Sequence, residues 1–176
     1  KNAIKPSFTP KEITEFYMTM HPGREEEYGL TLIKSIENDL KKVRIHIYGT
    51  EGQSTEKIIF HGIVPEEQMN EEIKNLQGAI RLNKHDGTSQ TVLKSILLGQ
   101  YQITCEKYEN VLQATTKKEL LEAIEYVKTK KTANMLSRET WLEKLNDFRW
   151  LKYPKNSISL VMIVKDEGKG LETAIK

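Results

Sequence analysis

The first half of the chain has the hydrophobic pattern of β-strands. From residue 43 to 48, apolar and polar side chains alternate strictly, which predicts a strand with one buried face and one partly open face. The expected buried side chains are Val43, Ile45 and Ile47, and the expected open side chains are Arg44, His46 and Tyr48. Further strands are expected at residues 13–20, 28–33 and 57–64, and a β-meander is the simplest way to connect them.

The pattern changes to helical spacing after Pro65, where two glutamates favour a helix start. The apolar positions expected to keep this helix in register are Met69, Ile73, Leu76 and Ile80. Later helices are expected from residue 88 or 89, behind a capping box of Thr116 and Glu119, and behind Ser137 as N-cap. A last apolar strand is expected at residues 158–164. Strands first and helices afterwards predict an α+β fold, in which a mostly antiparallel sheet packs against a group of helices.

The composition indicates a single globular domain over residues 1–176. Of the 176 residues, 38% are hydrophobic and 30% are charged, which is typical of a folded soluble protein. No apolar run approaches the roughly 20 residues that span a bilayer, so no membrane association is expected. Cys105 is the single cysteine, which excludes an internal disulfide and favours a reducing compartment. Because the chain begins at Lys1, we expect it to be excised from a larger protein.

The motifs that would indicate catalysis or a metal site are missing from the sequence. The chain contains no Walker loop, no GxGxxG, no HExxH and no paired CxxC. The histidines lie at spacings that indicate no metal site: His21, His46, His61 and His85. The net charge of +2 is modest for a dedicated nucleic-acid-binding domain. We therefore predict a non-catalytic binding module without a metal or a cofactor.

Aromatic residues lie at places where a ligand could reach them. Tyr48 lies at a strand end on the open face, beside Arg44 and His46. Tyr101 follows the second expected helix, and Phe8 lies in the N-terminal stretch. Taken singly, each is explained as a packing residue, because a buried aromatic ring with a wet hydroxyl is common.

Taken in order, these features resemble one family. From residue 7 to about 164 the chain is similar to the cap-binding domain of the orthomyxovirus polymerase basic protein 2 subunit, as a divergent, thogotovirus-like member. The stretches that carry the resemblance are Ser7-Phe8, residues 24–27, the strand 43–48, residues 58–62, Asp86-Gly87, residues 95–101, Trp141 to Phe148, and residues 158–164.

The resemblance implies a function in cap snatching during viral transcription. Its ligand would be the 7-methylguanosine cap of host mRNA, its partners the other viral polymerase subunits, and its location the host nucleus and the virion. Two aromatic rings would sandwich the positively charged base and a carboxylate would accept from guanine. By position, the residues carried over are Tyr48 and Tyr101 for the sandwich, Glu56 for guanine, Phe8 at the pocket edge, and Arg44 and His46 as basic strand residues.

Two alternatives stay open at this point. The family's guanine-reading lysine falls at about Glu71, and its asparagine–histidine phosphate contacts are not found before Trp141. A domain of the same fold that has lost cap binding, and serves as a structural or protein-interaction module of the polymerase, is therefore a second hypothesis. An unrelated module that binds RNA generally is a third.

Overall fold

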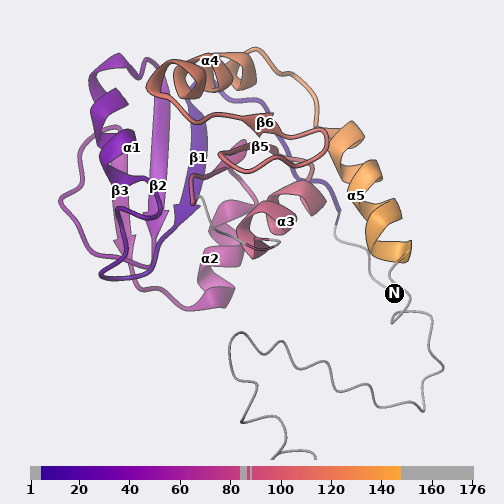
Figure 1. Ribbon diagram of the computed structural model, residues 1–176, viewed down its shortest axis with the longest axis horizontal. Coiled ribbons are helices and arrows are strands. Elements are labelled where there is room, and N and C mark those ends of the chain that lie inside the picture. The colour runs from indigo at the N-terminus through magenta and orange to yellow at the C-terminus, as the bar shows by residue number, and fades with distance from the viewer. Residues whose placement is uncertain (1–4, 84–86, 88, 148–176) are drawn as a thin grey trace, which may run out of the picture. The chain divides into compact units, whose positions relative to one another are not determined.

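The computed structural model describes residues 5–83, 87 and 89–147 (Figure 1). The chain divides into two compact units, Lys1–Glu143 and Lys144–Lys176. All the strands described below lie in the first unit. The strand expected at residues 158–164 lies outside the described residues.

The first unit is built on one sheet of parallel strands. Its strands are β1 (Thr14–Thr19), β2 (Val43–Tyr48), β3 (Ile58–Gly62), β4 (Gly78–Arg81), β5 (Tyr101–Thr104) and β6 (Leu112–Gln113). Every neighbouring pair is parallel, and the strand order is β3-β2-β1-β4-β5-β6. This is the order of a doubly wound, Rossmann-like α/β domain. The predicted α+β fold with a mostly antiparallel sheet is therefore wrong.

Helices cover both faces of the sheet. Those on the sheet are α1 (Leu30–Ile36), followed by the 3₁₀ turn η1 (Glu37–Asp39), then α2 (Glu66–Ile73), α3 (Gln90–Leu97) and α4 (Lys117–Lys128), and a further helix is α5 (Met135–Asp147). Helices α1 and α4 pack on one face, with buried apolar residues of both helices in the same cluster as β1 and β2. The ends of α2 and α3 contribute Ile73 and Leu98 to a second, smaller cluster on the opposite face. We call these the α1/α4 face and the α2/α3 face.

The predicted strand at residues 28–33 is a helix, and this decides the direction of the sheet. Leu30, Ile33 and Ile36 are all buried, at the spacing of one helical face. Because α1 carries the chain back over the sheet, β2 starts at the same end as β1 and pairs parallel to it. The predicted meander would have needed tight antiparallel turns.

The predicted helix through Ile80 ends earlier. Helix α2 stops at Ile73, and Gly78–Arg81 forms β4. Leu76 and Ile80 are still buried, so the hydrophobic positions alone fit both interpretations. A Cβ on Gly78 would lie 2.4 Å from the backbone oxygen of Tyr101, so the close approach of β4 and β5 requires glycine there.

The predicted capping box is confirmed at the start of α4. The Thr116 hydroxyl accepts from the Glu119 backbone N–H at 3.3 Å, and the Glu119 carboxylate accepts from the Thr116 backbone N–H at 3.0 Å. Hydrogen bonds from Thr115 and Thr116 lower the pKa of Glu119 to about 2. Ser137 is not an N-cap, because it lies inside α5 and its backbone N–H donates to the side chain of Asn134 at 3.3 Å.

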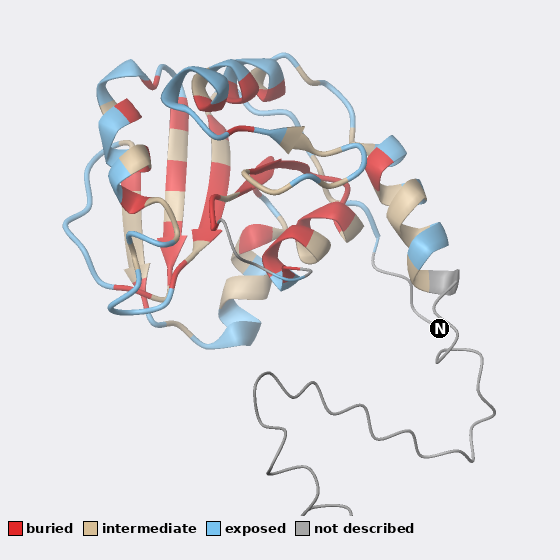
Figure 2. Ribbon diagram, in the orientation of Figure 1, coloured by how far each residue is buried: buried red, intermediate tan, exposed pale blue. Residues whose placement is uncertain are grey.

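Alternation along β2 assigns its side chains to the two faces as predicted. Val43, Ile45 and Ile47 join the apolar cluster of the α1/α4 face. Arg44 and His46, which alternate with the apolar side chains, are half-buried as expected, but Tyr48, which was predicted to be open, is buried at 2% exposure in the cluster of the α2/α3 face. Buried residues accordingly follow the centre of the sheet in Figure 2. The sheet thus has one continuous apolar face and one face that carries polar chemistry.

Candidate functional site

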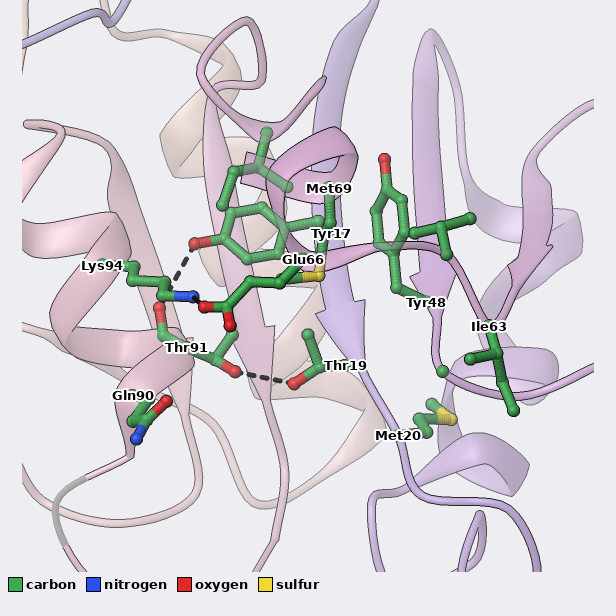
Figure 3. Close-up of a pocket in the computed structure, with 13 residues that line it drawn as sticks. Tyr17, Thr19, Met20, Tyr48, Ile63, Glu66, Met69, Gln90, Thr91 and Lys94 are labelled. Carbon is green, nitrogen blue, oxygen red and sulfur yellow. Dashed lines mark hydrogen bonds and ion pairs between the residues drawn. The ribbon is translucent and has the colours of Figure 1, made fainter. Parts of the chain in front are cut away.

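The strand order reverses between β1 and β4, and a cavity lies beside this point. In open parallel sheets, ligands bind outside the carboxyl ends of the strands where the order reverses. The cavity measures about 320 Å³ and lies on the α2/α3 face (Figure 3). It is lined by the ends of β1 and β2, by the connection between β3 and α2, and by α2 and α3. The lining residues are Tyr17, Thr19, Met20, Tyr48, Gly49, Ile63, Val64, Glu66, Met69, Ile73, Gln90, Thr91 and Lys94. We call it the α2/α3 cavity.

The wall formed by β1 and α3 is polar and tightly bonded. The Tyr17 hydroxyl donates to the backbone oxygen of Thr91 at 3.2 Å, and the hydroxyls of Thr19 and Thr91 lie 2.6 Å apart (Figure 3). Burial raises the pKa of Tyr17 well above its ordinary value, so this phenol stays neutral at physiological pH. The threonine hydroxyls offer a donor and an acceptor to a ligand.

An ion pair crosses the cavity from α3 to α2. Lys94 Nζ lies 2.6 Å from Glu66 Oε1 (Figure 3). It also donates to Asn70 Oδ1 at 3.2 Å. The hydrogen bond and charge of Lys94 lower the pKa of Glu66. The cavity therefore holds both a cation and an anion at neutral pH.

The opening of the cavity is apolar. Ile63 is 75% exposed, which is unusual for an isoleucine and places an apolar side chain at the rim. Met69 and Val64 are half-buried beside it. Gly49 forms part of the wall. This position requires glycine, because a Cβ would lie 2.3 Å from the backbone oxygen of Met20 and the φ of +90° is one that other residues rarely adopt. An aromatic or sugar ring could pack on this rim.

Behind Tyr48, a chain of titratable groups crosses β1, β2 and β3. The Tyr48 hydroxyl donates to Glu72 at 2.8 Å, and its ring stacks on His61 with centroids 4.4 Å apart. One imidazole nitrogen of His61 lies 2.9 Å from one of His46, whose other nitrogen lies 3.4 Å from Glu15. Burial, with the nearby Glu72, raises the pKa of Tyr48 and keeps its hydroxyl protonated. These contacts fix the orientation of the Tyr48 ring in the cavity wall.

Burial also lowers the pKa of His46, because the charged imidazolium is less well solvated there, and this outweighs the attraction of Glu15. Among the residues that the structure describes, no group of three or more histidine, cysteine or carboxylate side chains is arranged to hold a metal ion. In the same residues, no helix is long and apolar enough to cross a bilayer.

The sequence-predicted aromatic pair is separated by the sheet. Tyr48 ends β2 and belongs to the α2/α3 face, whereas Tyr101 begins β5 and belongs to the α1/α4 face. Since the strands are parallel, the two tyrosines lie toward opposite ends as well as on opposite faces. Tyr101 instead packs edge-to-face on Phe8 with centroids 5.5 Å apart, and its hydroxyl donates to Thr132. The two tyrosines cannot sandwich one base.

The other predicted site residues are also scattered. Glu56 is exposed before β3, in a shallow groove that Arg44 also lines at the amino ends of the strands. Arg44 lies 3.9 Å from Glu15, and His46 contacts the cavity only through His61 and Tyr48. Of the predicted residues, only Tyr48 lines the α2/α3 cavity. Four residues of the cavity were not predicted from the sequence: Thr19, Thr91, Lys94 and Glu66. The feature that could have identified them is their position, at the end of a strand or on the two helices that face each other across the cavity.

A second hollow lies at the carboxyl ends of the strands on the α1/α4 face. It measures about 640 Å³ and is lined by the connection before α1, by α1, and by residues after β4, β5 and β6. Its lining includes Arg24, Leu32, Leu82 and Cys105. Arg24 is paired with Glu27 in the same loop. The two hollows therefore lie on opposite faces of the sheet.

The fold is shared with solved structures of glycosyltransferases. The lipopolysaccharide outer core galactosyltransferase WaaB aligns with a TM-score of 0.60 at 13% identity, over 84% of this chain and 52% of that one. TarM aligns at 0.59 and 13% identity, over 82% and 36%. The pneumococcal O-GlcNAc transferase GtfA, in complex with UDP and GlcNAc, aligns at 0.56 and 13%, over 85% and 37%. The chain thus spans about half or less of these proteins.

These alignments show the fold alone: a Rossmann-like domain of the kind that these glycosyltransferase structures contain. No protein-family model and no curated protein sequence matches the chain. The predicted resemblance to the orthomyxovirus cap-binding domain is wrong, because the sheet is wholly parallel and its structural neighbours are transferases. The predictions that depended on this resemblance are wrong as well. They are the cap ligand, the viral polymerase partners, the non-catalytic role, and the alternative of a cap-binding fold that had lost its ligand. The location in the host nucleus and virion stays untested.

Proposed function

We propose that this chain is the nucleotide-sugar-binding domain of a glycosyltransferase, and that it binds a nucleoside diphosphate sugar in the α2/α3 cavity. The observation that carries the proposal is the position of the cavity, outside the carboxyl ends of β1 and β2 and beside the reversal of strand order. The glycosyltransferase fold and the UDP and GlcNAc bound to GtfA support this class of ligand. Because the chain spans 52% of WaaB and 37% of GtfA, we also propose that it is one domain of a longer protein.

The lining of the cavity suits a polar ligand with one apolar surface. The hydroxyls of Thr19 and Thr91 and the amide of Gln90 can exchange hydrogen bonds with sugar or ribose hydroxyls. Ile63 and Met69 offer apolar contact at the rim. At about 320 Å³, the cavity is near the small end of ligand sites, which fits a part of a nucleotide sugar.

Calorimetric titration of the 176-residue chain with UDP-GlcNAc and UDP tests the proposal. Two substitutions locate the ligand. Met69→Trp places a large ring in the α2/α3 cavity, and Leu32→Trp places the same ring in the hollow of the α1/α4 face. Both residues are half-buried on helices, so the two variants are matched.

We expect Met69→Trp to weaken binding about tenfold or more, the equivalent of about 1.4 kcal/mol, and Leu32→Trp to leave it within about twofold. The reverse pattern would move the site to the other hollow. No binding of either nucleotide by the unmodified chain would contradict the proposal.

A further inference from the structure

The α2/α3 cavity contains one cation and one anion, and they bind each other. Lys94 is the single lysine or arginine among the described residues that line it, and Glu66 is the single aspartate or glutamate. Their charged atoms lie 2.6 Å apart. We propose that Lys94 binds the diphosphate of the ligand, and that Glu66 occupies Lys94 in the ligand-free domain and must leave when the diphosphate binds. This inference rests on the proposed function.

The two partners differ in how firmly they are held. The Lys94 side chain is 30% exposed and reaches from the middle of α3 to Asn70 on α2, so its ammonium is fixed in the cavity wall. The Glu66 side chain is 71% exposed at the first position of α2. Such a carboxylate can turn into water with little loss of solvation, whereas Lys94 stays in place. The ion pair is therefore broken by movement of the Glu66 side chain, while the Lys94 ammonium keeps its position.

The charges make the exchange necessary. A diphosphate beside Lys94 would share its ammonium with Glu66, and a second negative group at that distance repels the ligand. An ammonium has three N–H donors, two of which Glu66 and Asn70 accept in the free domain. When Glu66 leaves, the ammonium can donate to phosphate oxygens in charge-assisted hydrogen bonds. The carboxylate thus acts as an internal competitor that lowers affinity for anions.

A plainer interpretation is that Glu66 only stabilises the fold. A carboxylate in the first turn of a helix interacts favourably with the helix dipole, and an ion pair can join α2 to α3. Glu67 occupies the same first turn and lines a neighbouring groove, which Lys94 also borders, but Glu67 does not line the cavity. It therefore shares the helix-end position of Glu66 without facing the ligand, which makes Glu67→Gln a matched control for Glu66→Gln.

The test measures UDP and uridine binding to four variants of the full chain by calorimetry at about 50 mM salt, where exposed charges are weakly screened. We expect Glu66→Gln to bind UDP about three- to tenfold more tightly than the unmodified chain, since one repulsive charge is removed. Lys94→Met should weaken UDP binding about tenfold. Glu67→Gln and Lys74→Met alter charges at the two ends of α2, at residues that do not line the cavity, and should stay within about twofold.

Uridine carries no phosphate, so its affinity should not change between Glu66→Gln and the unmodified chain. Urea unfolding of each variant separates an effect on the site from an effect on the fold. The inference is overturned if Glu66→Gln leaves UDP affinity unchanged or weakens it while the unmodified chain binds UDP; the proposed function then stands. If the unmodified chain binds neither UDP nor UDP-GlcNAc, the proposed function fails and this inference fails with it.

Discussion

The two faces of the sheet use the same strands for different purposes. On the α1/α4 face, Ile45 and Ile47 of β2 pack with the buried sides of α1 and α4 in one continuous apolar cluster. On the α2/α3 face, the intervening side chains of β2 are His46 and Tyr48, which belong to a network of polar contacts that ends at the ligand cavity. The apolar cluster on this face is smaller.

With the proposed ligand site, this difference would divide stability and ligand binding between the two sides of one sheet. Alternation along a strand makes such a division possible, because neighbouring residues point to opposite faces. The larger apolar cluster lies on the α1/α4 face, whereas the polar side chains of β2 lie on the α2/α3 face. Each of the following predictions tests this division.

The largest effect on stability is expected from the α1/α4 face. Ile45 is 0% exposed, and Ile45→Ala should lower the free energy of unfolding by about 2–5 kcal/mol, through lost burial and the cavity left behind. The same substitution at Ile63, which is 75% exposed at the cavity rim, should change it by less than about 0.5 kcal/mol. Urea unfolding of both variants measures the contrast. Equal losses at the two positions would remove the distinction between the faces.

A smaller effect is expected where α4 begins on the same face. Thr116→Ala removes the hydroxyl that accepts from the Glu119 backbone N–H, and should cost about 1 kcal/mol of unfolding free energy. Thr116→Ser keeps the hydroxyl and should retain most of that stability. Urea unfolding of both variants is the measurement. A loss of the same size in the serine variant would show that the cap hydroxyl is not the cause.

The smallest effect is a pH dependence from the α2/α3 face. Because burial lowers the pKa of His46 below its ordinary value of 6.5, the unfolded chain takes up a proton at higher pH than the folded domain does. Stability from this group is therefore present above pH 6.5 and is lost as the pH falls toward the folded pKa. His46→Gln should reduce the difference in unfolding free energy between pH 7.5 and pH 5.5.

His21→Gln is the control for that pH dependence, since His21 is exposed in the loop after β1 and its loss also removes an imidazole. The carboxylates with lowered pKa, such as Glu15 and Glu72, lose their contribution only below about pH 4.5, outside this window. An unchanged pH dependence in His46→Gln would contradict the role given to His46.

The local elements were easier to predict from the sequence than their arrangement. The alternation from residue 43 to 48 and the capping box at Thr116 both depend on neighbouring residues, and both are confirmed. The direction of the sheet depends on whether residues 28–36 cross over as a helix. Leu30, Leu32 and Ile33 fit a short strand as well as a helix, and only packing against the sheet decides between them.

The residues of the cavity could not be predicted from the sequence because they, too, depend on how the elements are arranged. Thr19, Glu66 and Lys94 are far apart in the sequence and belong to no motif, so only the parallel topology brings them to one edge. The interpretation of Tyr48 and Tyr101 as a pair came from the family resemblance, and it failed because the parallel sheet places the two rings on opposite faces. Tyr48 was found because a tyrosine at a strand end on the open face is informative in either topology.

The position of the ligand is the central claim, and amide chemical shifts test it most directly. We would titrate UDP into the ¹⁵N-labelled chain and follow each backbone amide. We expect the largest shifts at the carboxyl ends of β1 and β2 and along α3, at Thr19, Gly49, Thr91 and Lys94. Shifts concentrated at the amino ends of the strands around Arg44 and Lys57, or no shifts at saturating UDP, would contradict it.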